Sequence, residues 1–120
     1  MTHSGSDVKL ITDAPKDHCG LGESFAPTDL LAASVGSCVL TIMGIEAEKR
    51  NWDIKGASVI VNKKMACNPR RIKTIKVTTW LPENLSRAQK YDLKRISEKC
   101  PVILSIKDAI DIEYEWINLP

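Results

Sequence analysis

The sequence predicts an α+β fold in which an antiparallel sheet packs against one long, buried helix. Three observations predict it: an uncharged stretch from Leu30 to Ile45, several short segments in which apolar and polar residues alternate, and a later segment with helix-start signals. At 120 residues the chain can bury a core of its own. We therefore expect a single domain over residues 1–120.

The first expected elements are a strand and the long helix. Alternating residues predict a strand over Asp7–Thr12. Pro27 suits the first turn of a helix, and Thr28 and Asp29 can cap or complement its positive end. The helix should run to about Asn51. Because it is apolar on nearly every side, it is expected to be the centre of the fold.

The remaining elements are two strands, a helix, a short helical turn and a final strand. Ser86 with Gln89 forms a capping box that predicts a helix start. Pro101 should end that helix near Cys100 and begin a helical turn. Cys67-Asn68-Pro69 is typical of a turn. Three segments alternate apolar and polar residues and are expected to form strands: 57–62, 75–81 and 110–116.

Composition excludes several functions. The net charge is +2 and aromatic residues are 5% of the chain, which argues against nucleic-acid binding. The uncharged stretch is shorter than the roughly 20 residues of a membrane span, so no membrane partner is expected. Met1–Lys9 is polar and lacks a secretory signal, which predicts a cytoplasmic protein. The basic pairs Lys63-Lys64 and Arg70-Arg71 are expected to form a solvated rim.

Four cysteines, Cys19, Cys38, Cys67 and Cys100, carry the candidate chemistry. No CxxC pair occurs and only two histidines are present, so no metal site is expected. Cys38 lies inside the long helix, where burial alone would raise its thiol pKa and make it an inert core residue. A reactive Cys38 needs a nearby cation or hydrogen-bond donor.

Cys100 directly precedes Pro101, at an expected helix start, where the helix dipole and Lys99 would lower a thiol pKa. The alternative is an inert cap residue. His18–Cys19 is a candidate second redox pair or a coincidence of loop sequence, and Cys67 is expected to be a turn residue.

Two motifs together resemble the OsmC/Ohr family of thiol peroxidases, and specifically a divergent OsmC-like branch. They are SFAPTDLLAASVGSC (Ser24–Cys38) and CPV (Cys100–Val102), with NPRRI (Asn68–Ile72) between them. The resemblance extends from about Asp7 to Trp116. It implies an OsmC-like fold, an intertwined homodimer with long central helices, and an active site at the dimer interface.

The resemblance also implies a mechanism. Cys38 matches the peroxidatic cysteine and Cys100 the resolving cysteine of enzymes that reduce organic hydroperoxides, and often hydrogen peroxide, in oxidative-stress defence. The Cys38 thiolate becomes a sulfenic acid, Cys100 condenses with it to a disulfide, and an external dithiol, lipoyl in some members, resets the pair. No metal or organic cofactor is implied.

The sequence departs from the family at the group that activates the thiolate. Active members pair an N-terminal arginine with a glutamate ten residues before the peroxidatic cysteine. Here that position is Thr28, the nearest acids are Asp29 and Glu23, and the first arginine is Arg50, far along the same helix. We treat Thr28, Asp29 and Glu23 as candidate supporting residues.

Because the activating arginine is absent, several hypotheses for the function of the chain follow. We expect the N-terminal strand to be missing or shortened, which would leave a gap at the sheet edge. The partner's Arg70 or the partner's Arg71 is a candidate replacement for the arginine. Without a replacement, the chain would be a non-catalytic OsmC-like dimer that binds a ligand or acts in stress. The third hypothesis, after the enzyme and the non-catalytic dimer, is a structural or interaction protein with inert thiols.

Overall fold

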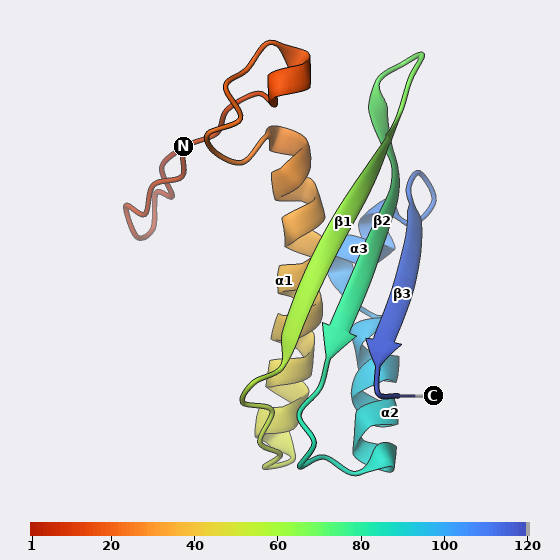
Figure 1. Ribbon diagram of the computed structural model, residues 1–120. Coiled ribbons are helices and arrows are strands. Elements are labelled where there is room, and N and C mark those ends of the chain that lie inside the picture. Colours follow the sequence, from red (N-terminus) through yellow and green to blue (C-terminus); the bar gives the residue numbers. More distant parts are fainter. Residues whose placement is uncertain (120) are drawn as a thin grey trace. The chain divides into compact units, whose positions relative to one another are not determined.

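The computed structural model describes residues 1–119, and the chain divides into two compact units. The first unit is Met1–Leu31, and the second comprises the residues from Ala32 onward. Helix α1 (Pro27–Lys49) starts in the first unit and continues through the second (Figure 1). The predicted helix is therefore present and ends two residues before the expected Asn51.

The first unit consists mainly of turns and loops. The backbone N–H of His3 donates to the carbonyl of Val8, which closes a turn near the N-terminus. A short 3-10 helix, η1, spans Lys16–His18. The Asp13 carboxylate then accepts hydrogen bonds from the backbone N–H groups of Leu21 and Glu23, both at 3.2 Å, and these bonds fix the loop that leads to α1.

The strand predicted over Asp7–Thr12 does not form. Lys9 and Thr12 make only isolated bridges, to Thr2 and Phe25. The segment does alternate apolar and polar residues. A strand, however, needs a neighbouring strand to pair with along its length, and the described residues of this unit provide none. Apolar side chains of the segment are accordingly exposed, Ile11 by 78%.

The second unit is a three-stranded sheet with helices on one face (Figure 1). The strands lie in the order β1-β2-β3. The expected elements are all present: β1 (Ser58–Ala66), β2 (Arg71–Trp80), α2 (Arg87–Ser97), α3 (Pro101–Ile106) and β3 (Asp111–Ile117).

The sheet is mixed, which corrects the prediction of an antiparallel sheet. β1 and β2 are antiparallel, whereas β2 and β3 are parallel, with Val77 beside Tyr114. The physical reason is the connection between them. Because α2 and α3 carry the chain back along the sheet, β3 starts at the same end as β2 and must run in the same direction.

One side of α1 forms the centre of the core. Val35, Val39 and Met43, spaced four residues apart, are at most 1% exposed and pack with residues of the sheet, α2 and α3. The opposite side of the helix is open, and Ile45 on that side is 48% exposed. The prediction that α1 is buried therefore holds for one face of the helix within a single chain.

By length and composition alone, α1 is also able to cross a membrane. A core helix of a soluble protein meets the same criteria. One face of α1 is buried in the core that it forms with the sheet, and the other face of that sheet carries polar residues. We therefore interpret α1 as a core helix.

Candidate active site

A disulfide joins Cys38 to Cys100, two residues separated by 62 positions in the sequence. Their Cα atoms lie 5.9 Å apart, within the usual range for a disulfide. Cys38 comes from the middle of α1, and Cys100 is the residue that directly precedes α3, with Pro101 in the first helical position. The fold thus brings together the two cysteines that the sequence motifs singled out.

The two sulfur-bearing residues differ in their access to solvent. Cys100 is 0% exposed and belongs to the core, together with Leu93 and Ile103. Cys38 is only half-buried and packs at the margin of that core. Any reactant from solution therefore has access to Cys38 and not to Cys100.

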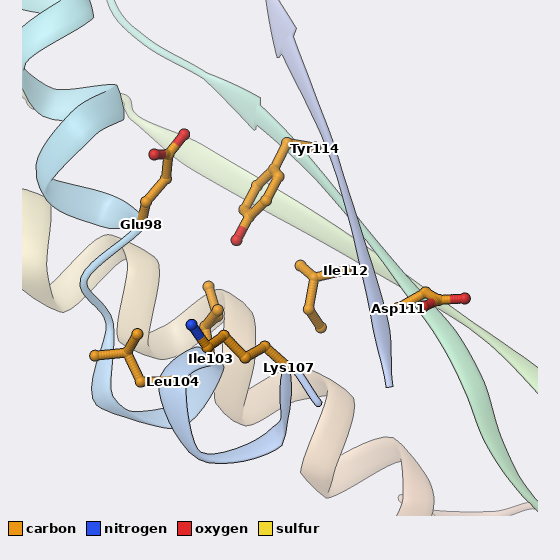
Figure 2. A pocket seen from close by; sticks show the side chains of 7 residues that line it. All are labelled: Glu98, Ile103, Leu104, Lys107, Asp111, Ile112 and Tyr114. Atoms are coloured by element: carbon orange, nitrogen blue, oxygen red, sulfur yellow. The ribbon is translucent and has the colours of Figure 1, made fainter. Parts of the chain in front are cut away.

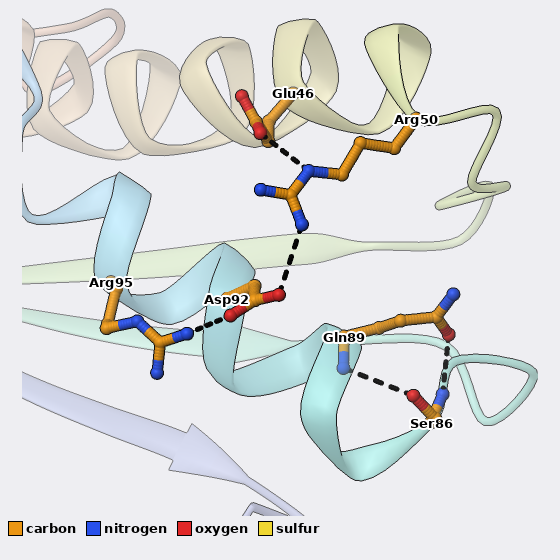
Figure 3. Close-up of polar contacts among 6 residues, drawn as sticks. All are labelled: Glu46, Arg50, Ser86, Gln89, Asp92 and Arg95. Carbon is orange, nitrogen blue, oxygen red and sulfur yellow. Dashed lines mark hydrogen bonds and ion pairs between the residues drawn. The ribbon is translucent and has the colours of Figure 1, made fainter.

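Helix α2 brings the chain to Cys100, and its start is fixed by the predicted capping box. The Ser86 hydroxyl accepts the backbone N–H of Gln89 at 3.1 Å, and the Gln89 side chain accepts the backbone N–H of Ser86 at 2.8 Å (Figure 3). These two bonds satisfy backbone donors that the helix itself leaves unpaired.

An ion-pair network then ties α2 to the C-terminal half of α1. Arg50 donates from Nε to Glu46 Oε1 at 2.8 Å and from Nη1 to Asp92 Oδ2 at 3.1 Å. Asp92 also accepts a hydrogen bond from Arg95 (Figure 3). The Arg50 guanidinium lies 4.8 Å from the centre of the Trp52 ring. The Arg50 guanidinium is thus paired with one acidic residue of α1 and one of α2.

The three candidate supporting residues all belong to the first unit. The Asp29 carboxylate accepts the backbone N–H of Ala26 at 2.9 Å, a contact that stabilises the start of α1. Glu23 is exposed, and Thr28 is half-buried in the first turn of the helix. Their support of the cysteine chemistry stays a prediction.

The other two cysteines are free thiols on the surface. Cys19 follows η1 with a left-handed backbone (φ 68°), and Cys67 lies in the turn between β1 and β2. Next to Cys67, the Arg71 guanidinium donates to the carbonyl oxygens of Cys67 and Pro69 at 3.1 and 2.9 Å. The predicted turn is therefore held by an arginine side chain. A role for His18–Cys19 stays a hypothesis.

The comparisons with known proteins show which family the chain belongs to. The family model described as OsmC-like protein matches residues 20–115, which include both cysteines of the disulfide. The chain belongs to the OsmC-like family. No curated protein sequence matches it.

Solved structures support the family assignment of this OsmC-like chain. A Psychrobacter arcticus protein, provisionally described as an osmotic stress induced and detoxification response protein, is 38% identical with a TM-score of 0.90. The similarity covers 96% of this chain and 84% of that one.

Two more distant structures share the fold. The organic hydroperoxide resistance protein OsmC of Legionella pneumophila is 19% identical (TM-score 0.73, covering 91% of this chain and 81% of that one). The organic hydroperoxide resistance protein OhrB of Bacillus subtilis is 17% identical (TM-score 0.64, covering 78% and 70%). At these identities the likeness establishes the fold.

The OsmC-like chain also has a pocket that the sequence did not indicate. It has a volume of about 390 Å³ between α3 and β3. Tyr114, Glu98 and Lys107 lie around it, whereas the Asp111 carboxylate points away from them (Figure 2). The pKa of Tyr114 is raised above its usual value of 10.0. Partial burial of the phenol is the larger cause, and the negative charge of Glu98 is the smaller one. The one sequence feature that could have pointed to this site is the alternation of β3, which turns Tyr114 towards the helices.

No metal centre is visible in the described residues 1–119, where no group of three or more His, Cys, Asp or Glu side chains could hold an ion. The chemistry that the arrangement supports is a two-electron exchange between a pair of thiols and a disulfide.

Proposed function

We propose that this OsmC-like chain is a thiol-dependent hydroperoxide reductase, with Cys38 as the peroxidatic and Cys100 as the resolving cysteine. The observation that carries the proposal is the Cys38–Cys100 disulfide, which is the product that such a cycle leaves behind. The fold shared with two proteins named for organic hydroperoxide resistance points to organic hydroperoxides as the substrate class.

In the proposed cycle the Cys38 thiolate attacks one oxygen of the O–O bond. That bond breaks, the alkoxide leaves and takes a proton to give an alcohol, and Cys38 becomes a sulfenic acid. The Cys100 sulfur then attacks the Cys38 sulfur and expels water, which forms the disulfide. The asymmetry in exposure suits this order, because only the half-buried Cys38 can meet a peroxide from solution.

The cycle is closed by an external dithiol, and a lipoyl group has the required chemistry. Its two thiolates supply the two electrons that reopen the disulfide, and the dithiol is itself oxidised to a disulfide. A reducing cytoplasm would keep such a dithiol available.

A homodimer is part of the proposal, and the open face of α1 supports it. Ser37, Thr41 and Ile45 are exposed along one side of a helix that carries no charge between Leu30 and Ile45. A second copy of the chain would cover this uncharged side and remove Ile45 from water. Sedimentation at micromolar concentration should give a dimer, and a monomer would contradict this part of the proposal.

The decisive experiment follows the consumption of cumene hydroperoxide with dithiothreitol as reductant. The wild type should consume the peroxide, and Cys38→Ser should abolish consumption. Cys67→Ser, which changes a free surface thiol, is the matched control and should leave the rate unchanged. Consumption that survives Cys38→Ser, or an inactive wild type, would refute the proposal.

A non-catalytic, ligand-binding OsmC-like dimer is the second candidate. It is favoured by the engagement of Arg50 with Glu46 and Asp92, and of Arg71 with the carbonyls of its own turn. The discriminating measurement is the alkylation rate of Cys38 against pH in Cys100→Ser. A thiol pKa below about 7 supports the enzyme, whereas a value of about 8.5 or higher supports the binding protein.

A further inference from the structure

The hairpin formed by β1 and β2 concentrates positive charge. Residues 58–80 contain six basic side chains and no acidic one. The rest of the chain holds eleven basic against fifteen acidic residues, so a chain of net charge +2 is divided into a hairpin of +6 and a remainder of −4. Such separation produces a strong local field, which net charge alone conceals.

Much of this charge lies at the end of the hairpin and is free to act on a partner. We call Lys64, Arg70 and Lys73 the basic tip; all three side chains are exposed. Within residues 1–119 no acidic side chain forms an ion pair with any of them. Lys76, further down β2, is by contrast paired with Glu115 at 3.2 Å.

The strand that leads to the basic tip packs against α1 near the disulfide. A Cβ on Gly36 would lie 3.0 Å from Cγ1 of Val61, so α1 touches β1 two residues before Cys38. Lys64 follows Val61 by three residues, which is about 10 Å along a strand. A domain-sized protein resting on the tip therefore lies within reach of Cys38.

We propose that the basic tip is the docking surface for an acidic protein that carries the dithiol needed to reopen the Cys38–Cys100 disulfide. This inference rests on the proposed function, because the hydroperoxide cycle ends in that disulfide. The occupant is a protein and not a polyanion for two reasons. The tip offers no aromatic ring for base stacking and no large exposed apolar side chain for insertion into lipid.

The exchange that follows docking is determined by burial. A thiolate of the partner attacks the sulfur of Cys38, because Cys100 has no exposed surface. The Cys38–Cys100 bond breaks, its electron pair stays on the Cys100 sulfur, and a mixed disulfide links Cys38 to the partner. The partner's second thiolate then displaces Cys38, which leaves two reduced cysteines on this chain and one disulfide on the partner.

The test measures how fast dithiol peptides reduce the oxidised chain. The peptides carry Cys-Gly-Pro-Cys flanked by four Glu, four Ser or four Lys. At an ionic strength of about 10 mM the Glu peptide should react at least about 10-fold faster than the Lys peptide. The advantage should vanish at 1 M salt, where the Debye length is about 3 Å.

Two triple variants separate the basic tip from net charge. Lys64→Gln/Arg70→Gln/Lys73→Gln should remove the preference for the Glu peptide. Lys55→Gln/Arg87→Gln/Lys107→Gln, which removes three exposed charges elsewhere, should retain most of it. Equal rates for the peptides, or equal losses in both variants, would overturn the inference.

Dithiothreitol separates this inference from the proposed function. If dithiothreitol restores peroxide consumption while the peptides show no charge preference, only the docking surface is refuted. If dithiothreitol cannot restore it, the proposed function fails and the inference fails with it. Binding of a 20-nucleotide RNA or of phosphatidylserine vesicles at 0.15 M salt, lost in the tip variant, would assign the surface to a polyanion and overturn the protein partner.

Discussion

Gly36 faces Val61 so closely that a Cβ at Gly36 would lie 3.0 Å from the valine Cγ1 and 3.2 Å from Cγ1 of Val59. The absence of a side chain at this position lets α1 approach β1. Since Cys38 follows two residues later on the same helix, this close approach also helps to set the depth of the cysteine in the fold.

Replacing Gly36 by alanine should destabilise the protein. Two β-branched side chains would have to move, at a cost of about 1–3 kcal/mol for overpacking. Over most of that range the cost is larger than the roughly 1 kcal/mol gained from better helix propensity. Urea denaturation of Gly36→Ala measures the change. In a double-mutant cycle with Val61→Ala the loss should shrink, and additive losses would contradict the contact as the cause.

Reduction of the Cys38–Cys100 disulfide should lower the free energy of unfolding by about 2–4 kcal/mol. The bond closes a long loop, since 62 positions separate the two residues, and it therefore restricts the unfolded chain. Urea denaturation with and without dithiothreitol measures the difference. Cys38→Ser should show the lower stability under both conditions, whereas Cys67→Ser should behave as the wild type does.

Arg50→Met should destabilise the chain more than Arg95→Met does. Arg50 bonds to Glu46 and Asp92 and lies over Trp52, whereas Arg95 pairs with Asp92 alone among its described contacts. The Arg50 side chain is 44% exposed and the Arg95 side chain 68%, so water screens both and the losses should be about 1 kcal/mol or less. The difference between the urea midpoints of the two variants should become smaller in 1 M salt, because salt screens the ion pairs. A larger loss for Arg95→Met would show that α2 is held to α1 by other contacts.

Tyr114 should titrate above the usual tyrosine value of 10.0, because burial and the charge of Glu98 both raise its pKa. The folded chain favours the neutral phenol, so this contribution to stability is complete below pH 10 and is lost as pH rises through the folded-state pKa. Near-ultraviolet absorbance of Tyr91→Phe, which leaves one of the two tyrosines, reports the titration. Glu98→Gln should lower the pKa only in part, since burial is the larger cause.

Local rules in the sequence were sufficient for most elements of the second unit. Ser86 and Gln89 specify the start of α2 through contacts three residues apart, and Pro101 sets the start of α3 in the same local way. The pairing of Cys38 with Cys100 is different, because no local pattern links residues so far apart. It came from the family resemblance and not from physics alone.

The predictions that differ from the structure concern how segments of the chain are placed relative to one another. The parallel direction of β3 depends on how α2 and α3 return the chain, although two helices between two strands already favour a parallel pair. The segment Asp7–Thr12 has the residue pattern of a strand but no partner strand within its unit. The contact of Arg50 with Asp92, 42 positions apart, likewise could not be found before the helices were placed.

The covalent ring closed by Cys38 and Cys100 contains β1, β2 and α2, and the exposed Arg70–Arg71 bond lies within it. Trypsin cleavage at that bond would leave two fragments still tied together through sulfur. The oxidised chain should therefore survive such a nick as one species on a non-reducing gel, and separate into two bands once a thiol is added. The same cut in the reduced chain would leave the two pieces without any covalent link, so the redox state governs what a single proteolytic event does to the molecule.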